Sequence, residues 1–299
     1  MKIAVFAISV VLLLIFSPLP GCSQFLDMEC GIRASSGGFA RVVNGRIANS
    51  NSSPWMAFLH TFQNEFICGG TLITSRLVLT AAHCLVPYTP LAVRLGELNK
   101  LQKNAYRQEH QVEKVFKHRL YDPKTHVNDI AIIKLTKTVV YSDHIRPICI
   151  VWESKWSSII DSIQVLTGTG WGMTEKSLES SELRTLDIWR QSPRMCTPAT
   201  VSSNQFCAGN WNSNLCKGDT GGPVGAIIRF KNSYRFVQIG VAITNTKCNR
   251  PSVYTDVLSH IDFILRVYRG HQGSDRIPPN STPNKEPKWD WSDTVPTLW

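Results

Sequence analysis

The shortness of its apolar runs is the feature that most constrains this chain. Between about residue 42 and residue 256, β-branched and aliphatic residues occur in many short runs, such as Leu77 to Leu79, Ile130 to Leu135 and Phe236 to Ile243. Clusters of Gly, Asn, Pro and Ser separate these runs at short intervals. Because many short strands divided by turn signals are typical of sandwiches and barrels, the sequence predicts an all-β body.

One helical signal follows that body. Apolar residues recur at the spacing of one helix face, and they would lay a single apolar stripe against the rest of the protein. They are Val257, Ile261, Ile264, Leu265 and Tyr268. We therefore expect a helix at the carboxyl-terminal end of the folded body.

The two ends of the chain differ from the body. Residues 1–23 combine Lys2, an apolar stretch from Ile3 to Phe16 and a Pro and Gly segment, which is the layout of a secretory signal peptide. Because the stretch is too short to span a bilayer comfortably, we expect a secreted, extracellular protein with no membrane partner after signal removal. Residues 270–299 are rich in Pro, Ser, Asn and charge, which predicts a disordered tail. Its tryptophans either anchor a partner or belong to an unconstrained extension.

The formal net charge is +10, from 32 Lys and Arg against 22 Asp and Glu. These cations are scattered and form no run, so the sequence predicts no nucleic-acid partner. A glycosaminoglycan-binding module remains open as a class of function, and it would show salt-dependent retention on a polyanion resin.

Nine cysteines are present, and Cys22 lies where a signal peptide would be cleaved. The other eight are Cys30, Cys68, Cys84, Cys149, Cys196, Cys207, Cys216 and Cys248. An even number in an exported chain indicates four disulfide bonds, and spacing alone leaves about 105 pairings. The sequence has no CxxC pattern, so we expect no metal and no other cofactor. Four histidines are interpreted as surface or loop residues and not as metal ligands: His110, His118, His126 and His144.

Three short segments carry the chemistry. Peptide hydrolysis by an alcohol needs a hydroxyl nucleophile, an imidazole to take its proton, a buried carboxylate to orient the imidazole, and backbone donors for the oxyanion. The segments are, in order, Leu79-Thr80-Ala81-Ala82-His83-Cys84, Asn128-Asp129-Ile130-Ala131 and Gly218-Asp219-Thr220-Gly221-Gly222-Pro223. They resemble the histidine, aspartate and nucleophile motifs of the chymotrypsin/trypsin family.

The resemblance implies both a fold and a set of roles. The family fold is two six-stranded antiparallel β-barrels with a carboxyl-terminal helix. His83, Asp129 and Thr220 stand at the catalytic positions, and the amides of Gly218 and Thr220 stand at the oxyanion positions.

The start of the body resembles the family's activation site, in the segment Arg41-Val42-Val43-Asn44-Gly45. Cleavage after Arg41 would make Val42 a new amino terminus, which in this family becomes buried and pairs with the carboxylate beside the nucleophile, here Asp219. A buried ammonium needs such a partner to offset its desolvation.

Trp171 within Gly170-Trp171-Gly172, and Val253-Tyr254-Thr255, extend the resemblance to most of residues 42–269. The implied organisation is a signal peptide at 1–23, a propeptide or light chain at 24–41, the peptidase domain at 42–269 and the tail at 270–299. The implied disulfide pairs are Cys68 with Cys84, Cys196 with Cys207, Cys216 with Cys248, and Cys30 with Cys149.

Thr220 departs from the family motif, which has serine. A β-branched side chain has few rotamers, so in a crowded turn one of its groups is expected to obstruct either the imidazole or the oxyanion pocket. Placement errors near 1 Å cost about 100-fold in rate. Threonine proteases use the threonine's own amino terminus as base, whereas Thr220 is internal.

Ile243 is a second departure, because the family has a serine there that donates a hydrogen bond to the triad aspartate. Its loss would leave Asp129 one donor short, and a hydrogen bond to a charged group is worth about 1.5 to 3 kcal/mol.

The substrate pocket also departs from the pattern of trypsin. Asn214, or Asn212 if the alignment slips, stands where trypsin is acidic, and Ser252 stands where glycine is expected. Thr244 and Asn245 continue the cleft wall, and Asn245 replaces a glycine that lets substrate approach. Neither asparagine supplies a negative charge, so we expect non-tryptic specificity.

Two functions compete. In the favoured hypothesis the chain is a catalytically impaired homologue that regulates extracellular proteolysis by binding proteases, inhibitors or protein substrates, after a separate protease has cleaved behind Arg41. In the alternative it is a working endopeptidase in which Thr220 is the nucleophile, His83 its base and Asp129 the group that orients His83.

Overall fold

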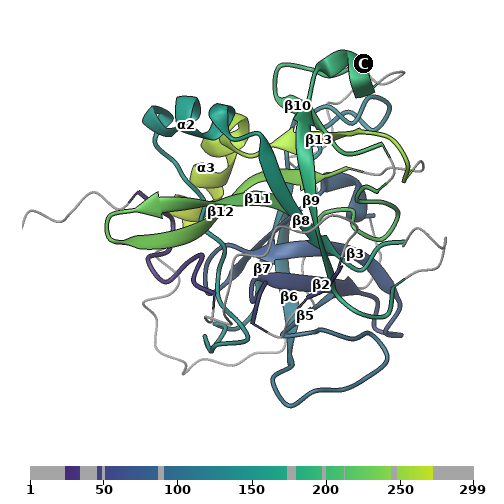
Figure 1. The fold of residues 1–299 in the computed structure, drawn as a ribbon. Coiled ribbons are helices and arrows are strands. Elements are labelled where there is room, and N and C mark those ends of the chain that lie inside the picture. Colours follow the sequence, from purple (N-terminus) through teal and green to yellow (C-terminus); the bar gives the residue numbers. More distant parts are fainter. Residues whose placement is uncertain are drawn as a thin grey trace, which may run out of the picture.

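Two closed antiparallel barrels form the body of the protein in the computed structural model (Figure 1). The structure describes residues 24–33, 46–48, 51–86, 91–173, 180–196, 200–211, 213–243 and 248–271. Within these ranges, no helix is long and apolar enough to cross a membrane.

The first barrel has the strand order β2-β3-β4-β7-β6-β5. Its strands are β2 (Met56–His60), β3 (Phe66–Leu72), β4 (Leu77–Thr80), β5 (Ala92–Leu95), β6 (Gln108–Lys117) and β7 (Ala131–Leu135). Every residue of β2, β4 and β7 is buried. These strands therefore read as continuous apolar runs because both of their faces are covered.

The second barrel has the order β9-β10-β13-β12-β11-β8, and pairing of β8 with β9 closes it. Its strands are β8 (Val165–Gly170), β9 (Arg184–Gln191), β10 (Gln205–Ala208), β11 (Pro223–Phe230), β12 (Ser233–Ala242) and β13 (Ser252–Asp256). The short β1 (Arg46–Ile47) adds to β9. The expectation of an all-β fold with two six-stranded barrels is confirmed.

The carboxyl-terminal helix α3 (Ile261–His271) lies where the apolar stripe predicts it. Ile264 is fully buried, and together with Val257 it joins the core of the first barrel. The sequence did not predict the six-residue helix α2 (Ser157–Ser162) or the single 3₁₀ turns η1 (Ala82–Cys84), η2 (Ser154–Trp156), η3 (Pro193–Cys196) and η4 (Leu258–His260). Helix α2 has only 6 residues, and Ile160 is the one that is buried. A helix this short leaves no periodic apolar pattern in the sequence.

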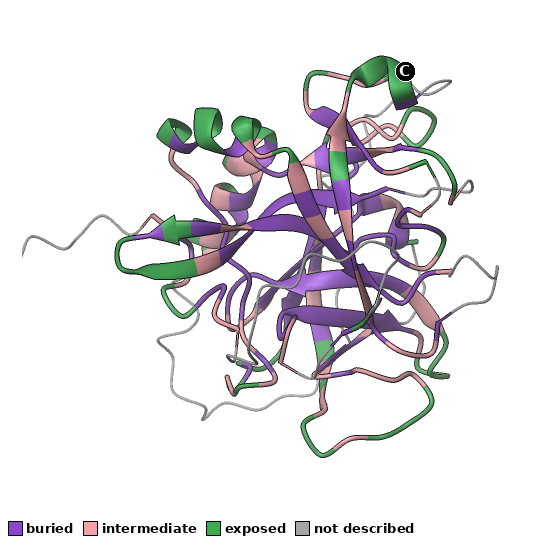
Figure 2. Cartoon of the chain, viewed as in Figure 1, coloured by how far each residue is buried: buried purple, intermediate pink, exposed green. Residues whose placement is uncertain are grey.

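Burial follows the barrels (Figure 2). One apolar cluster fills the first barrel and extends to Trp171, and a second cluster fills the second barrel. The strands are buried through the centre of the molecule, whereas much of α2 and the tip of the β11–β12 hairpin are exposed. Residues at the junction of the barrels are therefore held between two separately packed apolar cores.

The described residues contain four disulfide bonds: Cys30–Cys149, Cys68–Cys84, Cys196–Cys207 and Cys216–Cys248. These are the pairs that the family resemblance implies. Cys22, the signal-peptide segment, the proposed cleavage site and the tail after residue 271 lie outside the described residues.

Residues 24–33 pack against the body as well as being crosslinked to it. Phe25 is buried and forms an isolated bridge with Val151. The Tyr141 hydroxyl donates to the Asp27 carboxylate at 2.6 Å, and the Tyr268 hydroxyl on α3 donates to the Leu26 carbonyl at 3.0 Å. A segment expected to precede the activation cleavage is therefore anchored by noncovalent contacts in addition to one disulfide.

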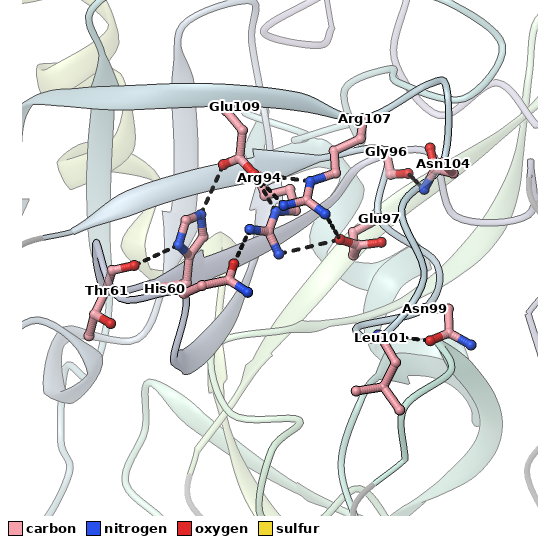
Figure 3. Close-up of polar contacts among 11 residues, drawn as sticks. His60, Thr61, Arg94, Gly96, Glu97, Asn99, Leu101, Asn104, Arg107 and Glu109 are labelled. Atoms are coloured by element: carbon pink, nitrogen blue, oxygen red, sulfur yellow. Dashed lines mark hydrogen bonds and ion pairs between the residues drawn. The ribbon is translucent and has the colours of Figure 1, made fainter.

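A charge network around the buried Arg94 and Glu97 joins β2, β5 and β6 (Figure 3). Arg94 on β5 is nearly inaccessible, and its guanidinium contacts Glu109 at 2.5 Å and Glu97 at 3.4 Å. Glu109 also bonds the His60 ring at 3.0 Å and Arg107 at 2.8 Å. Burial is the main cause that raises the pKa of Glu97, and the charges of Arg107 and Arg94 oppose it. Removing either arginine would leave that carboxylate poorly compensated.

We predict that Arg94→Met lowers the free energy of unfolding by about 3–5 kcal/mol, because breaking a buried ion pair leaves an uncompensated charge. Denaturant unfolding with the disulfides intact measures the loss. The matched control is Lys155→Met, which removes an exposed pair with Glu153 and should cost at most about 1 kcal/mol. Equal, small losses in the two variants would contradict the prediction.

Candidate functional site

His83 and Asp129 meet at the junction of the barrels. His83 lies in η1 directly after β4, and Asp129 lies two residues before β7, which pairs with β4. The His83 ring Nδ1 is 2.5 Å from Asp129 Oδ2, and the His83 backbone amide donates to Oδ1 at 2.9 Å. This geometry places the ring proton on Nδ1, so that in the neutral imidazole Nε2 carries the basic lone pair.

The carboxylate of Asp129 has no exposure to solvent. Burial is the largest influence on its pKa and raises it, but the contacts with His126 and His83 together with the His83 charge outweigh burial and bring the pKa to about 2. The group is therefore ionised at neutral pH and suited to hold the imidazole in one orientation.

The turn that contains Thr220 is tied to both barrels. The Thr220 carbonyl accepts from the Gly69 amide on β3 at 2.8 Å, and the Gly221 amide donates to Ala242 on β12 at 2.8 Å. Gly218 and Gly221 have φ values of +96° and +79°, a left-handed region that glycine enters without strain. Two glycines and one hydrogen bond to each barrel thus fix the backbone on either side of Thr220.

The side chain of Thr220 is less well connected than its backbone. Thr220 is buried, yet its hydroxyl forms no hydrogen bond with His83 or with any other residue in the described ranges. The amides of Gly218 and Thr220, which the resemblance places at the oxyanion site, likewise form no hydrogen bond within those ranges. The turn therefore presents two unengaged donors beside a hydroxyl that is not joined to its expected base.

Asp219 points away from Thr220 into the second barrel. Its Oδ1 accepts from the Gly172 amide at 2.7 Å and its Oδ2 accepts from the Cys216 amide at 2.8 Å. A Cβ on Gly170 or Gly172 would lie 2.0 or 2.2 Å from this carboxylate, so both glycines are required for close approach. Complete burial, the dominant effect, raises the pKa of Asp219 to about 6.

The only cation that lowers the pKa of Asp219 among the described residues is Lys100, which donates to the Trp171 carbonyl at 3.4 Å. After cleavage behind Arg41, the new amino terminus at Val42 is expected to pair with Asp219, as the family resemblance implies. Both Arg41 and Val42 lie outside the described residues.

The predicted pocket residues are only partly visible. Asn214 is buried, and its side-chain oxygen accepts from the Asn210 amide at 2.6 Å. Its nitrogen donates to the Asn210 and Cys248 carbonyls. The side chain is thus occupied by local backbone and brings no charge.

Ser252 begins β13, and Ile243 is buried directly after β12. Asn212, Thr244 and Asn245 lie outside the described residues.

His126 lies in the loop before β7, in agreement with the sequence prediction of a surface or loop residue, but its contacts were not predicted. Its Nδ1 lies 3.5 Å from Asp129 Oδ2, and its ring meets the His83 ring edge-on at 5.4 Å between centroids. No pattern within the loop indicates these contacts, because the placement of His126 depends on a hydrogen bond between its carbonyl and Gln205 on β10.

Among the residues that the structure describes, two groups of side chains have metal-ligand chemistry. His83, His126 and Asp129 offer ligand atoms within 4.8 Å of one another, and so do Cys68, His83 and Cys84. The two cysteines are joined in a disulfide and have no thiolate to offer. In the first group, the shortest contact is the His83–Asp129 hydrogen bond, which uses one nitrogen and one oxygen of the set.

Comparisons with known proteins match most of the chain. The family model described as Trypsin matches residues 42–264. Serine protease grass of Drosophila melanogaster is 31% identical over 80% of this chain and 69% of its own. The clotting factor G beta subunit of Tachypleus tridentatus is 30% identical over 82% and 84%. The CLIP domain-containing serine protease B15 of Anopheles gambiae is 30% identical over 84% and 75%.

We predict a pH dependence that originates at Asp219 in the uncleaved chain. Its folded pKa of about 6 exceeds the ordinary value of 3.8, so the folded state binds the proton more tightly than the unfolded state does. The group's contribution is therefore most favourable below about pH 4 and falls as pH rises toward 6, by up to about 3 kcal/mol.

Denaturant unfolding of the wild type and of Asp219→Asn at pH 4, 5, 6 and 7 isolates this group from other carboxyls. The wild type should lose stability relative to the variant between pH 4 and 6. A constant difference across the series would show that Asp219 does not titrate in this window.

Proposed function

Because the chain belongs to the trypsin family of serine proteases, we propose that it is a catalytically impaired member that regulates extracellular proteolysis by binding. The observation that supports this most is the contrast at the site. The imidazole and carboxylate are joined by a 2.5 Å contact, whereas the Thr220 hydroxyl has no hydrogen bond to the imidazole within the described ranges.

The residues that remain define which steps are affected. In acyl transfer, the hydroxyl attacks the carbonyl carbon of the peptide, its proton passes to His83 Nε2, and the Gly218 and Thr220 amides receive the developing oxyanion. The carboxylate that steadies His83 is retained, and so is the backbone of the turn. The proposed defect therefore lies in the attack step, where the extra methyl of Thr220 competes for the space its hydroxyl needs.

The alternative, a slow endopeptidase that uses Thr220 as nucleophile, draws support from the same backbone. His83 would act as base and Asp129 would orient it. The neutral Asn214 favours a substrate side chain other than lysine or arginine in that case.

Secretion and protein partners belong to the proposal as well. The signal-peptide pattern of residues 1–23 supports export, and four disulfides are typical of an oxidising compartment. The relatives are serine proteases and a clotting factor subunit by name, which supports partners among extracellular proteases, inhibitors or protein substrates. Cleavage after Arg41 by another protease would control the exposure of the binding surface.

We predict that, after cleavage behind Arg41, the wild type reacts with an active-site phosphonylating probe at least about 100-fold more slowly than Thr220→Ser. The reason is that serine keeps the hydroxyl and removes the methyl. Mass spectrometry of the labelled chain over time measures both rates, and peptide turnover is followed on the same samples.

Thr220→Ser combined with His83→Ala is the control, and it should lose the gained labelling. Rapid labelling and turnover by the wild type would overturn the proposal in favour of the endopeptidase. Labelling of neither protein would show that the obstruction extends beyond one methyl, to Ile243 or the cleft wall.

A further inference from the structure

Two histidine rings face the Asp129 carboxylate, that of His83 at 2.5 Å and that of His126 at 3.5 Å. A carboxylate has about four lone-pair positions, and a fully buried one needs donors at most of them. The His83 amide and ring supply two. Ile243, at the position where the family resemblance implies a serine donor, has no polar side-chain atom to supply another.

His126, three residues before Asp129 in the chain, also faces the Asp129 carboxylate. Its Nδ1 lies 3.5 Å from Oδ2, which is an ion-pair contact slightly longer than a normal hydrogen bond. That nitrogen is buried and has no hydrogen-bond partner among the described residues. An imidazole nitrogen facing a buried carboxylate at this distance needs a shift of well under 1 Å to donate fully.

The backbone of His126 is held in an unusual conformation. Its φ is +55°, a left-handed value that is uncommon outside glycine. Its amide donates to the Asp122 carbonyl at 2.8 Å, and its carbonyl accepts from Gln205 Nε2 on β10 at 2.9 Å. These bonds come from both barrels and retain a strained backbone that points the ring at Asp129, a pattern that favours a role for the side chain.

Asn128, in the same loop, also has a left-handed backbone that is held by contacts with distant residues. Asn128 has a φ of +57°, and its Oδ1 accepts from Asn204 Nδ2 at 2.5 Å and lies 3.1 Å from His260 Nε2. Its Nδ2 donates to the Leu120 carbonyl at 2.8 Å. The loop that presents His126 is thus anchored at two positions before Asp129 by side chains from the second half of the chain.

We propose that His126 is a positioning residue: it shares the Asp129 carboxylate with His83, supplies the donor that Ile243 lacks, and so sets the orientation and basicity of the His83 ring. This inference concerns the two imidazoles and the carboxylate alone. It holds whether or not Thr220 supports turnover, so its test and the test of the proposed function can fail independently.

Other charges near this group are few among the described residues. Lys117 on β6 acts on Asp129 through its charge, Tyr121 and Asp122 lie in the same loop as His126, and His83 is the remaining neighbour. The contact with Asp129 is the largest influence on the pKa of His126 and raises it, while burial lowers it. Protonated His126 therefore competes with His83 for one negative charge.

The test is an NMR titration of the histidine rings in the full chain, with wild type, His126→Leu and His126→Asn. His126→Leu removes the ring that competes with His83 for the negative charge of Asp129. This variant should therefore raise the pKa of His83 by about half a unit or more. His126→Asn keeps a donor and removes the charge, so its shift should be upward and smaller. His110→Leu is the matched control, since the His110 ring bonds Gln108 and should leave His83 unchanged.

A second measurement does not depend on whether the His126 variants fold. Asp129→Asn should lower the pKa of His126, because the carboxylate that raises it is gone. A purely structural His126 would change stability in its variants and leave the His83 titration where it was. An unchanged His83 in both His126 variants, or an unchanged His126 in Asp129→Asn, would overturn the proposal.

Discussion

The burial of one carboxylate is the constraint on which the centre of this molecule depends. Asp129 is charged at neutral pH and has no access to water, so its stability rests on donors delivered by the fold. The donors to the carboxylate come from His83 in η1, and His126 in the loop before β7 faces the same group at 3.5 Å. Thr255 on β13 donates to the Asp129 backbone carbonyl at 3.0 Å, so residues of both barrels hold Asp129 in place.

The same requirement explains why the loop from residue 118 to 129 is so heavily anchored. Two of its residues other than glycine adopt left-handed backbone conformations, each of which costs free energy unless surrounding contacts enforce it. The enforcing contacts are made by Asn204, Gln205 and His260, all from the second half of the chain. This loop of the first barrel is therefore held in its shape by contacts with the second half of the chain.

Much of this arrangement follows from the sequence, and the reasons are local. Short apolar runs and turn residues predict strands because alternation and turn chemistry act over a few residues, and the stripe from Val257 to Tyr268 predicts α3 for the same reason. Three contiguous motifs place His83, Asp129 and Thr220 because each motif includes the backbone that positions its side chain. Helix α2 is too short to leave a periodic trace.

What the sequence could not supply is contact between segments distant in the chain. The orientation of His126 depends on a hydrogen bond from Gln205, 79 residues away, and no pattern within the loop encodes it. The Arg94 network likewise joins residues of three strands, whose pairing had to be known first. In both cases the deciding interaction is tertiary, and propensity or spacing has no access to it.

At residue 220, the contacts that fix the backbone are independent of the side chain, and this affects catalysis and binding differently. The turn is fixed by Gly69, Ala242 and the glycines around it, and none of these contacts involves the Thr220 side chain. In the proposed function, the methyl group of Thr220 alters the path of an attacking hydroxyl without changing the scaffold that surrounds it. Recognition of an extended protein surface depends on that scaffold, whereas acyl transfer depends on the position of one oxygen to within about 1 Å. A single β-branched residue can therefore reduce catalysis while leaving the means of binding in place, which is the physical basis for separating the two functions in this chain.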